Sequence, residues 1–268
     1  MARNRTRAVV DRLVQVARRL TPHLMALPGA AAVAVDGSLA GGCVDERSDL
    51  DLHVYCSAVP APEVRRPFVH RLADPTPPPD VAVPPFGNED HFFLDGVRVE
   101  TIFLPIPDLW QRIYDAWTAG TPGSGCSTTW FYTLQHSQVL ADPSGALHEL
   151  RQALRTFPPR LRERLVSWNV ALAWHYLEHL ETALQRADWP FFTDRLARLL
   201  AAYFDALFAL NERFHPGEKR LLAYAAGCER APADHQRRLA RLVDPSTGAA
   251  ERVDLARDLL QDLAGLSP

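Results

Sequence analysis

The fold is decided by the stretch Val33-Ala-Val-Asp-Gly-Ser-Leu-Ala-Gly-Gly-Cys-Val-Asp-Glu-Arg-Ser-Asp-Leu-Asp-Leu-His-Val-Tyr55. It predicts a buried strand over residues 31–36, a Gly-Ser turn, and an Asp-x-Asp pair inside a second apolar strand that extends to residue 56. Side chains alternate between the two faces of a strand, which rises about 3.3 Å per residue. Asp49 and Asp51 are therefore expected on one face, about 7 Å apart, while Leu50 and Leu52 point into a core.

Two carboxylates fixed side by side repel each other unless a cation lies between them. Oxygen ligands spaced in this way suit Mg²⁺, which takes one or two carboxylates and completes its shell with water and substrate phosphates. A third acidic residue, Glu100, lies in the apolar run Val97–Leu104. A charge in such a strand is costly unless it has a partner, and a metal beside Asp49 and Asp51 would be one.

The order Gly37-Ser38, ten residues, Asp49-Leu50-Asp51 resembles the signature of the DNA polymerase β-like nucleotidyltransferases, a superfamily that includes small antibiotic-modifying enzymes. The resemblance extends mainly over residues 30 to 105. That family needs a third carboxylate on a later strand, and Glu100 fits this place. The resemblance implies that Asp49, Asp51 and Glu100 hold one or two Mg²⁺ ions. Whether Glu100 is a metal ligand or the general base on the acceptor hydroxyl stays open.

Three further residues are candidates for binding the nucleotide. Gly37 lets the backbone approach a phosphate closely, and the Ser38 hydroxyl can donate to a β- or γ-phosphate oxygen. Lys219 is the single lysine among 29 basic residues, and lysine offers a compact point charge where arginine offers a planar fork. In the relatives a helical domain closes over the nucleotide, so Lys219 is expected to reach the triphosphate from such a domain.

Composition narrows the class of protein. Hydrophobic residues make up 47% of the 268 residues, as in ordinary globular proteins, and no apolar run is long enough for a membrane span. The net charge of −3 disfavours nucleic acid as a partner. The four cysteines lack the paired spacing of a zinc site, and we expect reduced thiols in a cytoplasmic protein. The basic N-terminus lacks the features of a secretory signal.

Along the chain, the pattern predicts an α+β protein. Asp95-Gly96 is a two-residue turn signal within a hairpin over residues 91–100, which delivers Glu100. Apolar residues then recur at helical spacing over 160–186, after Pro190, and in shorter segments near 234–242 and 250–263. We therefore expect a catalytic domain over residues 1–145, with a mixed β-sheet and flanking helices, and an all-α helical bundle over 146–268 that closes over the nucleotide and acceptor cleft.

The leading functional prediction is an Mg²⁺-dependent nucleotidyltransferase that moves an NMP unit from an NTP, with ATP as the first candidate, to a hydroxyl of a small molecule. A second hypothesis is a nucleotidyltransferase whose acceptor is a protein, as in toxin–antitoxin nucleotidyltransferases. A third hypothesis is a non-catalytic, nucleotide-binding regulatory module. The sequence does not name the acceptor, choose among the NTPs or give the oligomeric state.

Overall fold

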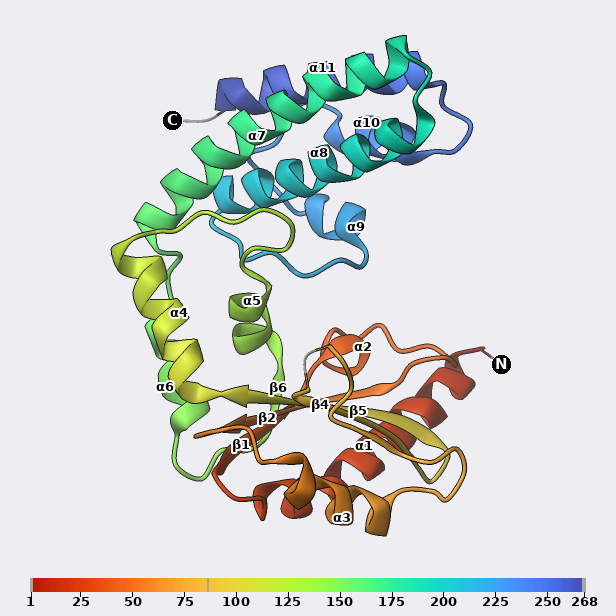
Figure 1. Cartoon of the computed structure of the whole chain (residues 1–268), viewed down its shortest axis with the longest axis vertical. Coiled ribbons are helices and arrows are strands. Elements are labelled where there is room, and N and C mark those ends of the chain that lie inside the picture. Colours follow the sequence, from red (N-terminus) through yellow and green to blue (C-terminus); the bar gives the residue numbers. More distant parts are fainter. Residues whose placement is uncertain (1, 86, 267–268) are drawn as a thin grey trace. The chain divides into compact units, whose positions relative to one another are not determined.

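The computed structural model describes residues 2–85 and 87–266 and confirms the predicted α+β class (Figure 1). The chain forms two compact units. The first consists of Met1–Ile113 and Thr133–Ala153, and the second of Tyr114–Tyr132 and Leu154–Pro268. The sequence predicts one boundary at residue 145, whereas each unit is built from two separate segments. Two of the three divisions fall within helices that the sequence pattern did not predict, α4 (Ile106–Thr118) and α5 (Thr129–His136), and the third follows α6 (Ala146–Ala153).

A six-stranded mixed sheet forms the centre of the first unit. In spatial order its strands are β3 (Asp80–Val81), β4 (Glu89–Leu94), β5 (Val97–Pro105), β2 (Leu50–Cys56), β1 (Ala30–Val35) and β6 (Gln138–Ala141). Strands β2 and β5 run parallel, and all other neighbours are antiparallel. The two predicted strands and the predicted hairpin are confirmed. The edge strand β6 has no counterpart in the prediction.

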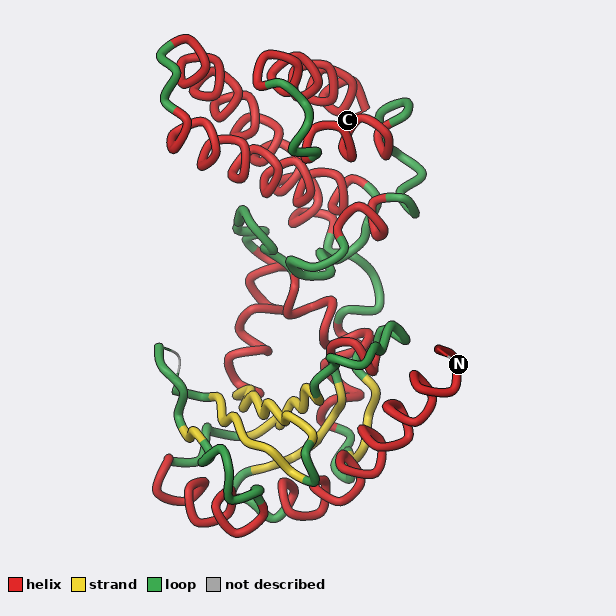
Figure 2. The backbone as a smooth tube through the Cα atoms, turned by 90° about the vertical axis from the view of Figure 1, so that its right-hand side faces the viewer, coloured by secondary structure: helices red, strands yellow, loops and turns green. Residues whose placement is uncertain are grey.

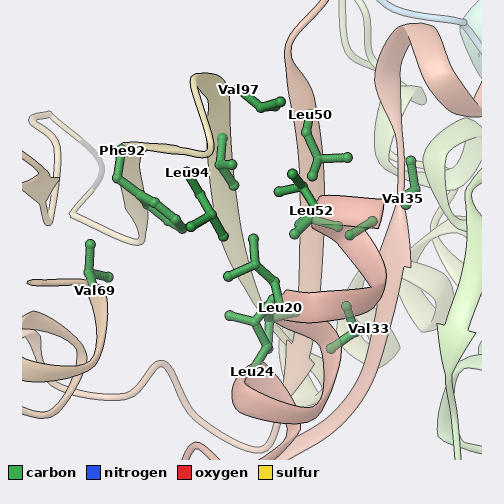
Figure 3. Packing of buried hydrophobic residues seen from close by; sticks show 14 of the residues in the cluster. Leu20, Leu24, Val33, Val35, Leu50, Leu52, Val69, Phe92, Leu94 and Val97 are labelled. Carbon is green, nitrogen blue, oxygen red and sulfur yellow. The ribbon is translucent and has the colours of Figure 1, made fainter. Parts of the chain in front are cut away.

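Two helices, α1 (Ala2–Met25) and α3 (Pro62–Leu72), cover one face of this sheet (Figures 1 and 2). Leucines of α1 pack against apolar side chains of the central strands, and Figure 3 shows Leu20 and Leu24 beside Val33 and Leu52. Fully burying such a side chain contributes about 1.5–3 kcal/mol. Alternation along β2 therefore fixes Leu50 and Leu52 toward the helices and turns Asp51 to the opposite face.

A buried ion pair ties α3 to the hairpin. Arg65 and Asp90 are both fully buried, with Nη1 and Oδ1 2.7 Å apart, and the second Arg65 Nη donates to the carbonyl of Gly87 at 2.7 Å. The guanidinium also lies over the ring of Phe103, 4.7 Å from its centroid. The hairpin itself turns at Asp95-Gly96, where both residues have positive φ angles of 52° and 66°. This is the two-residue turn that the sequence predicts.

The second unit is helical. Its helices are α7 (Pro159–Gln185), α8 (Trp189–Leu210), α9 (Leu221–Ala225), α10 (His235–Val243) and α11 (Ala249–Leu266). Helices α7 and α8 form an antiparallel pair, because only residues 186–188 join them, and α11 packs on α7. Asp188 caps α8 by accepting a hydrogen bond from the backbone of Phe191 at 3.2 Å. The second half of α8, residues 202–210, is buried throughout.

Two further observations concern the helices and the cysteines. Within residues 2–85 and 87–266, no helix has the length and apolar character that a membrane crossing requires. The four cysteines, all within the described chain, form no disulfide, and Cys56 and Cys228 are buried.

Candidate active site and metal centre

Three carboxylates meet on the face of the sheet that α1 and α3 leave uncovered. Asp49 immediately precedes β2, Asp51 lies in β2, and Glu100 lies in β5. One oxygen from each lies within 4.8 Å of one oxygen of each of the others, and all three residues are partly exposed. The prediction that these three side chains lie close together is confirmed. Asp49 differs from expectation only in standing one residue before the strand.

Parallel pairing brings the two strands' acids together. In the register of β2 and β5, Asp51 lies directly opposite Glu100, and Leu50 lies opposite Val99. The acids therefore share one face, while their apolar neighbours share the core. Since neighbouring strands lie about 4.8 Å apart, this register brings the Asp51 and Glu100 side chains close to each other on one face of the sheet.

Gly37 makes room for one of these carboxylates. Its φ is +64°, and a Cβ built on it would lie 1.7 Å from Asp51 Oδ2. The backbone N–H of Asp36, the residue before it, donates to the Asp51 carbonyl at 3.0 Å. A side chain at position 37 would therefore have to displace Asp51, so the turn glycine and the acid form one structural unit.

Ser38 follows Gly37 in a four-residue helical turn, α2 (Gly37–Ala40). Its carbonyl accepts from the backbone N–H of Cys43 at 3.0 Å, which closes the loop after the turn. The Ser38 Oγ is buried and makes no hydrogen bond within the described part of the chain. A buried hydroxyl normally has a partner, so this atom is a candidate for contact with a bound group.

Glu100 has a cationic neighbour that sequence reasoning did not assign. Arg98, two residues earlier on the same face of β5, lies with an Nη 2.6 Å from the Glu100 carboxylate. Its side chain is 53% exposed, so the pair stabilises the fold by about 1 kcal/mol or less. The signal was the i, i+2 spacing of the two charges on one strand face.

Asp36 and His53 form a second polar pair beside Asp51. Thr133 donates to the Asp36 carboxylate at 3.0 Å, and His53 Nδ1 lies 3.8 Å from the same carboxylate. Burial lowers the pKa of His53, which the Asp36 charge opposes in part. The imidazole is therefore neutral at neutral pH. Asp36 directly follows β1, and His53 lies in β2 two residues after Asp51, on the same face of that strand. The pair therefore lies beside the carboxylate cluster.

The donor set fits a hard divalent cation. Asp49, Asp51 and Glu100 offer oxygen ligands alone, at mutual distances that one ion can bridge, and they remain partly open to solvent. Mg²⁺ prefers such ligands and keeps several positions for water or phosphate. A zinc site would instead be expected to contain histidine or cysteine.

Lys219 belongs to the second unit, so its predicted contact with the nucleotide stays a prediction. It is exposed and lies between α8 and α9, two residues before α9 begins. Arg220, the N-cap residue of α9, follows it in the sequence.

Comparison with known proteins finds one matching family and several similar solved structures. A family described as a domain of unknown function (DUF4037) matches residues 125–221, so the three carboxylates lie outside the matched region. No curated protein matches the chain. Among solved structures, the chain is similar to the crystal structure of a nucleotidyltransferase-like protein from Exiguobacterium sibiricum, at 15% identity and a TM-score of 0.47. The similarity covers 94% of this chain and 73% of that one.

Proposed function

We propose that this protein is an Mg²⁺-dependent nucleotidyltransferase that transfers an NMP unit from an NTP, with ATP as the first candidate donor, to a hydroxyl of a small molecule. One observation carries the proposal: three carboxylates, from β2, β5 and the residue directly before β2, offer oxygen atoms that lie within 4.8 Å of one another. They stand beside a Gly-Ser turn whose glycine is required by the Asp51 carboxylate.

The reaction forms a bond between the acceptor oxygen and the α-phosphorus. It breaks the bond from that phosphorus to the bridging oxygen of the β-phosphate, so pyrophosphate leaves. Bound Mg²⁺ would neutralise charge on the triphosphate and help to align the attacking and leaving oxygens. Asp49 and Asp51 hold the cation in this proposal. The Ser38 hydroxyl donates to a phosphate oxygen of the leaving group, which would give its buried Oγ a partner.

Glu100 has two roles to choose between. As a metal ligand it completes the oxygen set, and its register with Asp51 supports this role. As a general base it accepts the proton of the acceptor hydroxyl. In either role the Glu100 carboxylate has the Arg98 guanidinium as a neighbour.

The helical unit has a proposed part in binding. Lys219 would contact the triphosphate as a compact cation, and the helices would close over the nucleotide and acceptor. The net charge of −3 is more suited to a cationic acceptor, such as an aminosugar, than to a nucleic acid.

The test is release of pyrophosphate from each of the four NTPs, with and without Mg²⁺, across aminoglycosides, lincosamides and candidate protein acceptors. We expect release that depends on an acceptor and on Mg²⁺, and that disappears in the double variant Asp49→Asn/Asp51→Asn. Asp80→Asn is the matched control, because Asp80 is exposed in the same unit and lies outside the carboxylate cluster.

The possible results distinguish the three functional hypotheses. Turnover that persists in the double variant would refute the catalytic assignment. Mass added to a protein, detected by mass spectrometry, would identify a protein acceptor. Metal-dependent NTP binding without turnover on any acceptor would identify a non-catalytic nucleotide-binding module.

A further inference from the structure

A cavity of about 560 Å³ lies wholly within the helical unit. Its walls are mostly apolar and come in part from α8, α9 and α10, with Leu200, Phe204, Leu221 and Val243 among the lining side chains. This volume falls in the range of pockets that enclose small organic ligands, which are typically apolar with a few polar groups. None of the residues in the proposed nucleotidyl transfer lines it.

One wall of the cavity is a rigid loop. The buried Asp205 carboxylate, on α8, accepts hydrogen bonds from the backbone N–H groups of Gly125 at 2.5 Å and Ser127 at 3.0 Å. The Ser127 hydroxyl donates to the same carboxylate. Between them Cys126 lines the cavity with a φ of +61°, a left-handed conformation that a non-glycine residue adopts only where its surroundings impose it. The pocket wall is therefore preformed.

The polar groups of the cavity favour a cation over an anion. Glu218 lines it with an exposed carboxylate. His215 also lines it, and burial lowers the pKa of that imidazole to about 4, so it carries no positive charge at neutral pH. Burial first, and then the charges of Asp205 and Glu218, raise the pKa of the Cys126 thiol. Two carboxylates, those of Asp205 and Glu218, thus act on Cys126, and Arg220 is the arginine that lines the same cavity.

We propose that this cavity is a binding site for a small amphiphilic amine, whose apolar body lies against Leu200 and Phe204 and whose ammonium group pairs with Glu218. The apolar walls supply the larger part of the binding free energy. A partly exposed ion pair adds a smaller preference, worth about two- to five-fold in affinity. The cavity shares no residue with the carboxylate cluster. The proposed amine site can therefore be tested independently of the proposed nucleotidyl transfer.

The test uses three probes with the same body and different head groups: 4-phenylbutylamine, 4-phenylbutan-1-ol and 4-phenylbutyrate. Each is titrated against the rate at which iodoacetamide alkylates Cys126 in the full-length protein, followed by peptide mapping. Cys43 is the internal control, because it is also partly exposed but belongs to the other unit. We expect all three probes to protect Cys126 and not Cys43, with the amine about two- to five-fold tighter than the alcohol.

Two variants and a control sharpen the result. Glu218→Gln is expected to remove the preference of amine over alcohol, while Glu229→Gln, at an exposed glutamate that does not line the cavity, preserves it. Ala197→Trp places a large ring at an exposed wall position of α8, and is expected to weaken all three probes together. Calorimetric titration of the same probes gives the affinities without the thiol.

Several results would overturn the proposal. Tighter binding of the butyrate would assign the head-group contact to Arg220 and an anion. Equal affinity for amine and alcohol in the wild-type protein would remove Glu218 from recognition. Protection of Cys43 to the same degree, or no protection of Cys126 together with no calorimetric binding, would mean that the cavity is not a ligand site.

Discussion

The α-carbon of Gly37 faces the carboxylate of Asp51 so closely that a Cβ at this position would lie 1.7 Å from Oδ2. The backbone φ of +64° at Gly37 is also one that glycine adopts without strain. The turn and the acid therefore constrain each other. A substitution at Gly37 tests whether the position of Asp51 matters for metal binding, without altering any of the three carboxylates.

Gly37→Ala is expected to weaken binding of Mg²⁺ or its paramagnetic substitute Mn²⁺ by at least about ten-fold, because the added methyl group pushes a ligand out of place. Gly42→Ala is the matched control. Gly42 has a φ of +65°, but nothing lies within 4 Å of its Cβ position. Both variants carry the same backbone strain of about 1 kcal/mol, and only the first disturbs Asp51. Electron paramagnetic resonance titration with Mn²⁺ measures the difference, and equal affinities in the two variants would contradict the prediction.

Neutralising one carboxylate should separate the effects of repulsion and metal binding on stability. In EDTA, Asp49→Asn is expected to keep or raise the melting temperature, because it removes a negative charge from beside two others. In Mg²⁺ the wild-type protein is stabilised by mass action, by about 2.7 kcal/mol at a hundred times the dissociation constant, and the variant loses most of this gain. Thermal unfolding with and without Mg²⁺ measures both effects, with Asp80→Asn as the control. A variant that is less stable in EDTA, yet responds fully to Mg²⁺, would exclude the metal role.

His215 should make the helical unit sensitive to acid. Burial lowers the pKa of this imidazole in the folded protein to about 4, against about 6.5 in an unfolded chain. Between these two pKa values the His215 imidazole is protonated in more of the unfolded chains than of the folded ones. The contribution of the neutral, buried imidazole to the free energy of unfolding is therefore complete above about pH 6.5 and is lost as the pH falls toward 4. From about pH 7 to about pH 5 this amounts to about 2 kcal/mol.

Urea unfolding of the wild-type protein and of His215→Gln at both pH values isolates this contribution. Glutamine keeps a side-chain acceptor for the backbone N–H of Gly217, which donates to His215 Nδ1 at 3.2 Å. The free energy of unfolding should fall about 2 kcal/mol less in the variant than in the wild-type protein. An identical fall in both proteins would show that other groups cause the acid sensitivity.

The buried pair of Arg65 and Asp90 should be among the most sensitive positions of the first unit. Arg65→Met leaves the Asp90 carboxylate buried without its cation, which costs about 3–5 kcal/mol. Adding Asp90→Asn removes the uncompensated charge and should restore part of the loss, since an amide oxygen can still accept from the backbone of Ala82. Denaturant unfolding of the two single variants and the double variant gives the coupling energy, and strictly additive losses would show that the pair does not act as a unit.

The sequence identified the three acidic residues that converge, but not the strand pairing that brings them together. Charged residues in apolar strands could be identified from the sequence, and these are Asp49, Asp51 and Glu100. The Gly-Ser turn, separated from Asp49 by ten residues, marked the first two further. The parallel pairing that sets Asp51 opposite Glu100 could not be derived in this way. It joins residues about fifty positions apart, and local periodicity contains no information on which strands become neighbours.

Other structural features could not be predicted from the sequence for similar reasons. Strand β6 is short and pairs with a strand more than a hundred residues earlier, so no local pattern of its own marks it. Asp205 interrupts the buried, mostly apolar second half of α8, and only the fold shows that it holds the loop at Gly125 and Ser127. The side-chain partner of Glu100, in contrast, stood two residues away in the sequence and could have been found from strand alternation.

The division of the chain has a practical consequence for dissecting the protein. A fragment ending at Ile113 would lack β6 and leave β1 as an open sheet edge, which invites pairing between molecules. A cut after Ala153 would keep the sheet complete but remove residues 114–132 from the helices they pack with. Neither half can therefore be excised as one continuous piece, and isolating either would require rejoining its two segments with a linker.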